Sequence, residues 1–217
     1  MNVICSVALA LLMDISGSLG VADWEAQVEG HARAFESAAI GQVIDSTGPI
    51  AVRADAFSDG HRTILTWRLL TTSEDAQQFA ADFRQHSLNF PGGGGTMTAA
   101  ALEASGATFA SVPCEAERQV IDLVTDGYPY DGVRMPQVRQ ALIDVDIQLN
   151  AIFVQTEDGY RQSIARGYTD GFDWLSQEVI TPGGLVFSLE GWQDFERTIR
   201  RKLIWELANV SPIFLAP

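Results

Sequence analysis

An uninterrupted apolar run near the N-terminus most constrains how this chain can fold. Its sequence, SVALALLM over residues 6–13, lacks the alternation of a strand that has one face in water. A run of this kind is typical of a strand buried on both faces of a parallel sheet. It is too short to cross a membrane as a helix, and it lacks the basic start and small-residue cleavage site of a secretory signal. We therefore expect a structural strand; a signal peptide of the gene product would precede this chain.

Strand-like and helix-like patterns alternate along the rest of the chain. Residues 49–70 contain two strand patterns around Ser-Asp-Gly, which predicts a hairpin with Asp59 in its turn. Three more strand patterns follow, and helical patterns separate the strands; the strands are 118–127, 147–154 and 183–190, and the helices begin near 23, 72, 96, 136 and 192. This alternation predicts an α/β fold with a mostly parallel, doubly wound sheet and helices on both faces. No repeat or long linker interrupts it, so we expect a single domain over 1–217.

The last helical pattern is amphipathic. One stripe is apolar, and four basic residues, Arg197, Arg200, Arg201 and Lys202, fall mostly outside it. We expect these basic side chains to form a solvated helix face.

The charge balance limits the class of partner. The formal net charge is −14, and a nucleic-acid-binding surface would be basic and clustered. An acidic chain is also poorly suited to docking on an anionic membrane. The 47% apolar content argues against extensive disorder. The sequence therefore predicts a folded chain that attracts cations, although an acidic surface can also serve solubility alone.

Side chains with oxygen atoms follow the predicted strand ends and a glycine-rich loop. In open α/β sheets ligands bind outside the carboxyl ends of the strands, which is where both strand-end aspartates fall. Carboxylate and hydroxyl oxygens suit Mg²⁺, Mn²⁺ or Ca²⁺ rather than Zn²⁺. The candidates are Asp14, Ser16 and Ser18 in DISGS, Thr96 or Thr98 in GGGGTMT, and Asp126 in VTDG. Taken singly, these segments can equally be a capping turn, a flexible loop and a plain turn.

The same three segments resemble the metal-ion-dependent adhesion site (MIDAS) of von Willebrand factor type A (VWA) domains. The resemblance implies Thr96 rather than Thr98 as the threonine of the site. It implies the sheet order 3-2-1-4-5-6 with one antiparallel edge strand. It also implies a bound divalent cation with an open position, through which the domain engages an Asp or Glu of a partner protein.

A narrower resemblance involves WEAQVEGHARAFES, ERQVID, TPGGLVFSLE and RTIRRKL. These segments look like a bacterial, often secreted, VWA-like family of unknown function. Membership implies a periplasmic or secreted protein and no enzymatic activity. Family members often carry Gly-Asp-Gly where this chain has Thr-Asp-Gly, but the aspartate that would face the metal, Asp126, is retained.

The two cysteines, Cys5 and Cys114, form no Cys-x-x-Cys pair, so a thiolate zinc site is disfavoured. By themselves they can be two buried thiols or one disulfide. The resemblance places them on neighbouring strands and so implies a disulfide, which fits an oxidising periplasm.

The loop after Asp126 is expected to border the site, with Tyr128, Tyr130 and Asp131 as a partner-binding rim or as an ordinary solvated loop. The leading hypothesis is a non-enzymatic, metal-dependent protein-binding module without membrane insertion. Two alternatives are a hydrolase that uses a Mg²⁺-activated water and a structural domain with an empty site. Against the hydrolase, DISGS lacks a second aspartate and GGGGT lacks the lysine of a phosphate loop.

Overall fold

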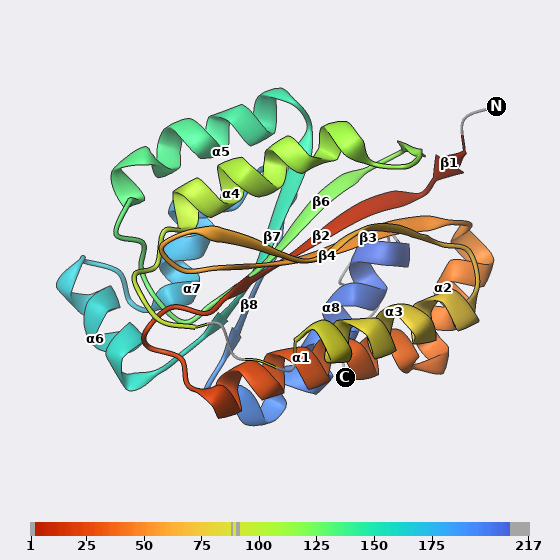
Figure 1. Ribbon diagram of the computed structural model, residues 1–217. Helices are drawn as coiled ribbons and strands as arrows, with labels where there is room; N and C mark the ends of the chain where they lie inside the picture. Colours follow the sequence, from red (N-terminus) through yellow and green to blue (C-terminus); the bar gives the residue numbers. More distant parts are fainter. Residues whose placement is uncertain (1–2, 88, 90–91, 209–217) are drawn as a thin grey trace.

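The computed structural model describes residues 3–87, 89 and 92–208, and a six-stranded sheet lies at its centre (Figure 1). Its strands are β2 (Val7–Asp14), β3 (Ile50–Phe57), β4 (His61–Leu70), β6 (Gln119–Thr125), β7 (Ile147–Val154) and β8 (Val186–Leu189). Their order is β4-β3-β2-β6-β7-β8, and β4 alone runs antiparallel to its neighbour. Counted in chain order within this sheet, that is 3-2-1-4-5-6. The predicted fold class is confirmed.

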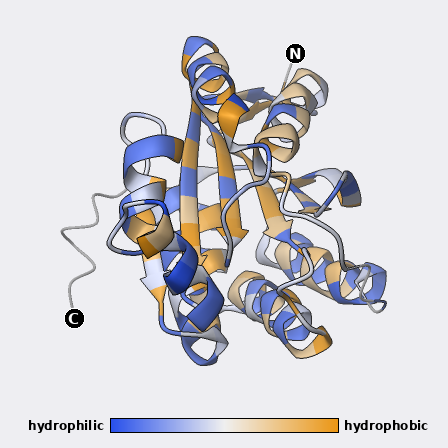
Figure 2. Cartoon of the chain, turned by 90° about the vertical axis from the view of Figure 1, so that its left-hand side faces the viewer, coloured by the Kyte–Doolittle hydropathy of each residue, from blue (hydrophilic) through white to orange (hydrophobic). Residues whose placement is uncertain are grey.

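The apolar run of β2 is buried on both faces, as its sequence predicts. Leu9 and Leu11 point into one core, and Ala10 and Leu12 into the other; all are fully buried. Four helices cover the first face: α1 (Val21–Glu36), α2 (Ala38–Thr47), α3 (Ser73–His86) and α8 (Phe195–Ala208). The helices α4 (Thr98–Ala107) and α5 (Met135–Asp144) cover the second face (Figure 1). Figure 2 shows strands that are largely hydrophobic between helices that carry both colours.

Shorter elements complete the molecule. The helix α6 (Glu157–Ala165) lies at the end of the sheet where the parallel strands finish, and α7 (Gly171–Trp174) continues into a π-helical turn, Leu175–Val179 (Figure 1). Three 3₁₀ turns span Thr108–Ser111, Gly132–Arg134 and Trp192–Asp194. Within the described residues, no helix combines the length and the apolar character that crossing a membrane requires.

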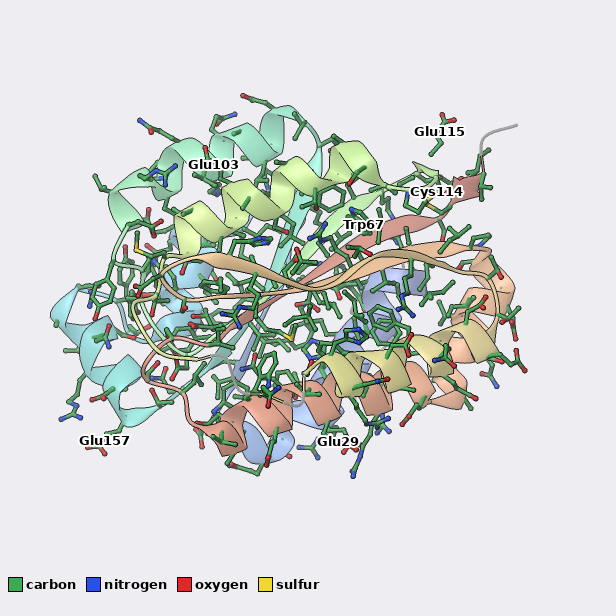
Figure 3. All side chains as sticks on the ribbon, in the orientation of Figure 1. Glu29, Trp67, Glu103, Cys114, Glu115 and Glu157 are labelled. Atoms are coloured by element: carbon green, nitrogen blue, oxygen red, sulfur yellow. A yellow bond between two sulfur atoms is a disulfide. The ribbon has the colours of Figure 1, made fainter. Side chains whose placement is uncertain are left out.

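A second sheet, which the sequence did not predict, lies at the opposite end. It pairs β1 (Ile4–Cys5) with β5 (Glu115–Ala116) in parallel. The structure contains the Cys5–Cys114 disulfide that the family resemblance implied. Figure 3 labels Cys114 at the end of the molecule away from α6. The disulfide therefore connects the segments that precede β2 and β6, far from the carboxyl ends of these strands, where the candidate site lies.

The basic face of α8 differs from the prediction at one position. Arg197, Arg200 and Arg201 are exposed as expected, but Lys202 is fully buried. Its Nζ forms ion pairs with Asp122 in the middle of β6 and with Glu206, at 2.5 Å for the latter. Lys202 is buried because it lies on the stripe of α8 that packs against the sheet, beside Ile199 and Leu203, where Asp122 demands a cation.

A neutral partner and a shifted pKa complete this buried cluster. Asn150 Nδ2 on β7 donates a hydrogen bond to Glu206 Oε1 over 2.6 Å. Burial, together with the nearby charge of Asp122, raises the pKa of Glu206 to about 8. Burial thus favours the protonated form of Glu206, whereas the ammonium group of Lys202 opposes that rise in pKa.

Candidate functional site

The candidate site lies in a small hollow at the carboxyl ends of β2 and β6. The hollow itself measures about 110 Å³, whereas pockets for drug-sized molecules span roughly 300–1,000 Å³. Four of the predicted oxygen-bearing side chains line it: Ser16, Ser18, Thr96 and Asp126. A hollow of this size suits an ion and a short side chain.

A continuous series of oxygen contacts joins the three predicted loops. Thr96 Oγ1 donates a hydrogen bond to Ser16 Oγ over 3.0 Å. The Oγ atoms of Ser16 and Ser18 lie 3.4 Å apart, and Ser18 Oγ donates to Asp126 Oδ1 over 2.7 Å. Thr96 lies 80 positions from Ser16 in the sequence, and Asp126 lies 108 positions from Ser18. Their side chains nevertheless meet at one point in the fold.

Asp14 lies beneath these oxygens, at the end of β2, and is fully buried. Its Oδ1 accepts a hydrogen bond from the Ser16 amide over 2.7 Å, and its Oδ2 accepts one from Thr125 Oγ1 over 2.6 Å. Gln27 Nε2 donates to the Asp14 carbonyl over 3.0 Å. Both carboxylate oxygens and the main chain of Asp14 are thus held in place.

Sequence reasoning missed Thr125 and Gln27. Thr125 stands one residue before the strand-end Asp126, so a hydroxyl beside a predicted ligand was the available signal. Gln27 is a buried polar residue on α1, 13 positions from Asp14. Its role depends on how α1 packs against β2, which no local pattern reveals.

The site concentrates negative charge in a buried place. Burial raises the pKa of Asp14, and hydrogen bonds from Thr125 and Ser16 partly oppose that rise. Burial, reinforced by repulsion from Asp14, raises the pKa of Asp126 to about 7. The second oxygen of Asp126, Oδ2, is buried and has no hydrogen-bond partner among the described residues. A cation beside Asp126 would remove both the repulsion and the unsatisfied oxygen.

The donor set fits a hard divalent cation. Octahedral Mg²⁺ binds oxygen at roughly 2.0–2.1 Å, which places neighbouring ligand oxygens about 2.9 Å apart. The successive contacts of 3.0, 3.4 and 2.7 Å from Thr96 to Asp126 are close to that spacing. No group of three or more His, Cys, Asp or Glu side chains suited to a metal occurs in the described part of the chain. A metal at this site would therefore depend on hydroxyl groups as well as carboxylates.

The glycine-rich loop packs directly on the first loop. The Gly17 amide donates to the Gly94 carbonyl over 2.9 Å, and the Gly93 amide donates to the Ile15 carbonyl over 2.9 Å. Gly94 has a φ of +85°, a conformation that side chains disfavour. Pro91, at the start of the predicted loop, lies outside the described residues. The close backbone approach brings Thr96 to the hollow, whereas Thr98 is buried at the start of α4.

The predicted rim residues occupy three different environments. Tyr130 lines the hollow and is 79% exposed. Tyr128 also lines it but is only 3% exposed, because its ring packs near Trp174 and its hydroxyl donates to Ser163 Oγ over 2.7 Å. Asp131 is turned away from the hollow. Its carboxylate accepts hydrogen bonds from the first-turn amides of α4, which residues 99 and 100 supply at 3.1 and 2.7 Å.

The sequence matches, over residues 4–211, the family described as a protein of unknown function (DUF1194). No curated protein matches the chain. Among solved structures it is similar to proximal thread matrix protein 1 (PTMP1) from the mussel byssus with a zinc-occupied MIDAS motif. That match has 15% identity and a TM-score of 0.64, over 95% of this chain and 49% of the other.

Two further structures are similar. A von Willebrand factor type A structure from Catenulispora acidiphila matches at 15% identity and a TM-score of 0.63, over 94% of this chain and 43% of the other. The PilB minor pilin from Streptococcus sanguinis matches at 15% identity and a TM-score of 0.65, over 95% of this chain and 63% of the other. The chain thus spans only part of the length of each of these proteins. At such identities the similarity shows a shared fold, and it confirms the VWA resemblance. The chain has the VWA fold and belongs to the DUF1194 family, whose function is unknown.

Proposed function

We propose that the protein is a non-enzymatic, divalent-metal-dependent binding module. Asp14, Ser16, Ser18, Thr96 and Asp126 would hold Mg²⁺, Mn²⁺ or Ca²⁺. The observation that carries the proposal is the contact series from Thr96 Oγ1 to Asp126 Oδ1, which joins three loops beside a buried carboxylate oxygen that no described residue hydrogen-bonds. A bound ion would supply positive charge at the floor of the hollow.

The ligand chemistry favours binding of an acidic group. Three of the five oxygen-bearing side chains are neutral hydroxyls, which offset the charge of a cation less than carboxylates do. The ion would therefore attract an anionic oxygen from outside. The hollow of about 110 Å³ leaves room for one short acidic side chain, an Asp or Glu of a partner protein.

The similar structures and the disulfide support an extracytoplasmic binding role. The names of the similar proteins include a minor pilin and a thread matrix protein with a zinc-occupied MIDAS motif. The Cys5–Cys114 disulfide suits an oxidising compartment. We propose that the protein is periplasmic or secreted and takes part in adhesion or assembly through protein contacts.

A thermal-shift titration tests metal binding. Each ion is added to the wild type, to Asp14→Ala and to Asp45→Ala, which removes an exposed aspartate of α2 as a matched control for charge. At 100 times the dissociation constant, binding stabilises the fold by about 2.7 kcal/mol, which raises the melting temperature of a chain of this size by roughly 5–11 °C. The shift should persist in Asp45→Ala and disappear in Asp14→Ala. If none of the three ions shifts the wild type, the proposal fails.

A second experiment tests the partner. Immobilised wild type is incubated with periplasmic extract or culture supernatant in Mg²⁺, and the bound proteins are eluted with EDTA. A protein that binds to the wild type and to Asp45→Ala, but not to Asp14→Ala, supports the proposal. Metal-dependent turnover of a phosphate ester that Asp14→Ala abolishes would instead establish a hydrolase.

A further inference from the structure

The main chain around Thr96 is held by the β3–β4 hairpin. The Gly95 amide donates a hydrogen bond to Asp59 Oδ1 over 2.6 Å. The Met97 amide donates to the Ser58 carbonyl over 3.0 Å. Thr96 therefore stands between two residues that are both bonded to the same turn. The hydrogen bond to Asp59 involves a side chain, whereas the one to Ser58 joins main-chain atoms.

The loop also fits tightly against the Asp59 side chain. A β-carbon added to Gly94 would lie 2.1 Å from Asp59 Oδ2, and one added to Gly95 would lie 3.0 Å from Asp59 Oδ1. Real β-carbons do not approach an oxygen as closely as the first of these distances. The two glycines thus let the loop close onto the carboxylate group.

Asp59 is not placed to contact an ion directly. It is an exposed residue of the hairpin turn and is not among the residues that line the hollow. We infer that Asp59 is a positioning residue: it fixes the glycine-rich loop so that Thr96 Oγ1 meets Ser16 Oγ, and it thereby sets the affinity of the site for its cation. This inference rests on the proposed function, because it concerns the same site.

Two substitutions separate the hydrogen bond from the charge. Asp59→Ala removes both, whereas Asp59→Asn removes the charge and keeps an oxygen that can accept from the Gly95 amide. Because residues that orient metal ligands typically contribute about 10–100-fold to metal affinity, Asp59→Ala should weaken Mn²⁺ binding at least about tenfold. Asp59→Asn should bind within about threefold of the wild type. Isothermal titration calorimetry with Mn²⁺ alone measures all three dissociation constants.

Hydrogen exchange in the metal-free proteins provides an independent measurement. The Gly95 amide should exchange faster in Asp59→Ala than in the wild type or Asp59→Asn. Amides in the centre of β2 should exchange alike in all three, because Asp59 lies on an exposed turn. A change limited to the loop distinguishes local positioning from a general loss of stability.

The outcomes separate this inference from the proposed function. If the wild type binds Mn²⁺ and Asp59→Ala binds it equally well, the role of Asp59 is refuted while the metal site stands. If Asp59→Asn is as weak as Asp59→Ala, the charge of Asp59 acts and the positioning role is refuted. If the wild type itself binds no Mn²⁺, the proposed function and this inference are refuted together.

Discussion

The Cys5–Cys114 disulfide closes a covalent loop with a sequence separation of 109. That loop contains β2, β3 and β4, half of the strands of the main sheet. The chain-entropy relation for such a loop gives an unfolded-state entropy loss of about 16 cal/mol/K, or about 4.8 kcal/mol at 25 °C. Without the disulfide, the two-residue pairing of β1 with β5 would depend on a few backbone contacts, such as Glu115 N to Val3 O at 2.8 Å.

We therefore expect the double variant Cys5→Ala, Cys114→Ala to lose about 3–5 kcal/mol of unfolding free energy. Urea titration followed by circular dichroism measures the loss without reductant, and a second titration repeats the comparison with reductant added to both proteins. Reductant should destabilise the wild type and leave the double variant unchanged. The urea dependence of the free energy should become steeper in the variant, because its unfolded chain is less compact and exposes more surface. A loss below about 1 kcal/mol would contradict the entropic argument.

The buried cluster on α8 supplies two further predictions. Lys202→Met should lower the unfolding free energy by about 3–5 kcal/mol in urea titration, because it leaves Asp122 buried without a cation, and adding Asp122→Asn should restore part of it. The pKa of Glu206, raised to about 8, means that the folded state holds this proton more tightly than the unfolded state does. The resulting contribution to the unfolding free energy is complete below about pH 4.5 and declines as the pH rises towards 8. Glu206→Gln should flatten that decline in unfolding free energies measured between pH 5 and pH 8; equal slopes in both proteins would rule out Glu206 as its source.

The sequence predicted the layers of this fold more completely than the contacts between them. The continuous apolar run of β2 is sufficient to predict burial on both faces, and the structure confirms that burial. The burial of Lys202 was missed, because the stripe of a helix does not reveal what lies opposite. A signal did exist in β6: Asp122 interrupts an otherwise apolar strand, and a carboxylate there requires a cation from a packed neighbour.

The convergence of the three loops of the site was predictable for a similar reason. Parallel strands end at the same edge of a sheet, which places Asp14 and Asp126 on that edge, and the strand order implied by the VWA resemblance makes their strands neighbours. The surroundings of these residues were less predictable. Asp131 follows Asp126 closely in the sequence, yet its carboxylate accepts from the first turn of α4, an element that precedes it by about 30 residues. Spacing along the chain does not determine which helix terminus a loop carboxylate will reach.

The loops of the site are joined to one another by hydrogen bonds. The first loop bonds to the glycine-rich loop, which bonds in turn to the β3–β4 hairpin through Gly95 and to the third loop, where the Tyr130 amide donates to the Thr96 carbonyl over 2.9 Å. Such cross-bracing places the oxygens before any ion arrives, so binding would not have to order the loops. Substitutions at the bracing contacts should therefore change ion affinity while leaving the cores intact. The exposed Asp59 is the side chain through which that separation of affinity from fold stability is most directly accessible.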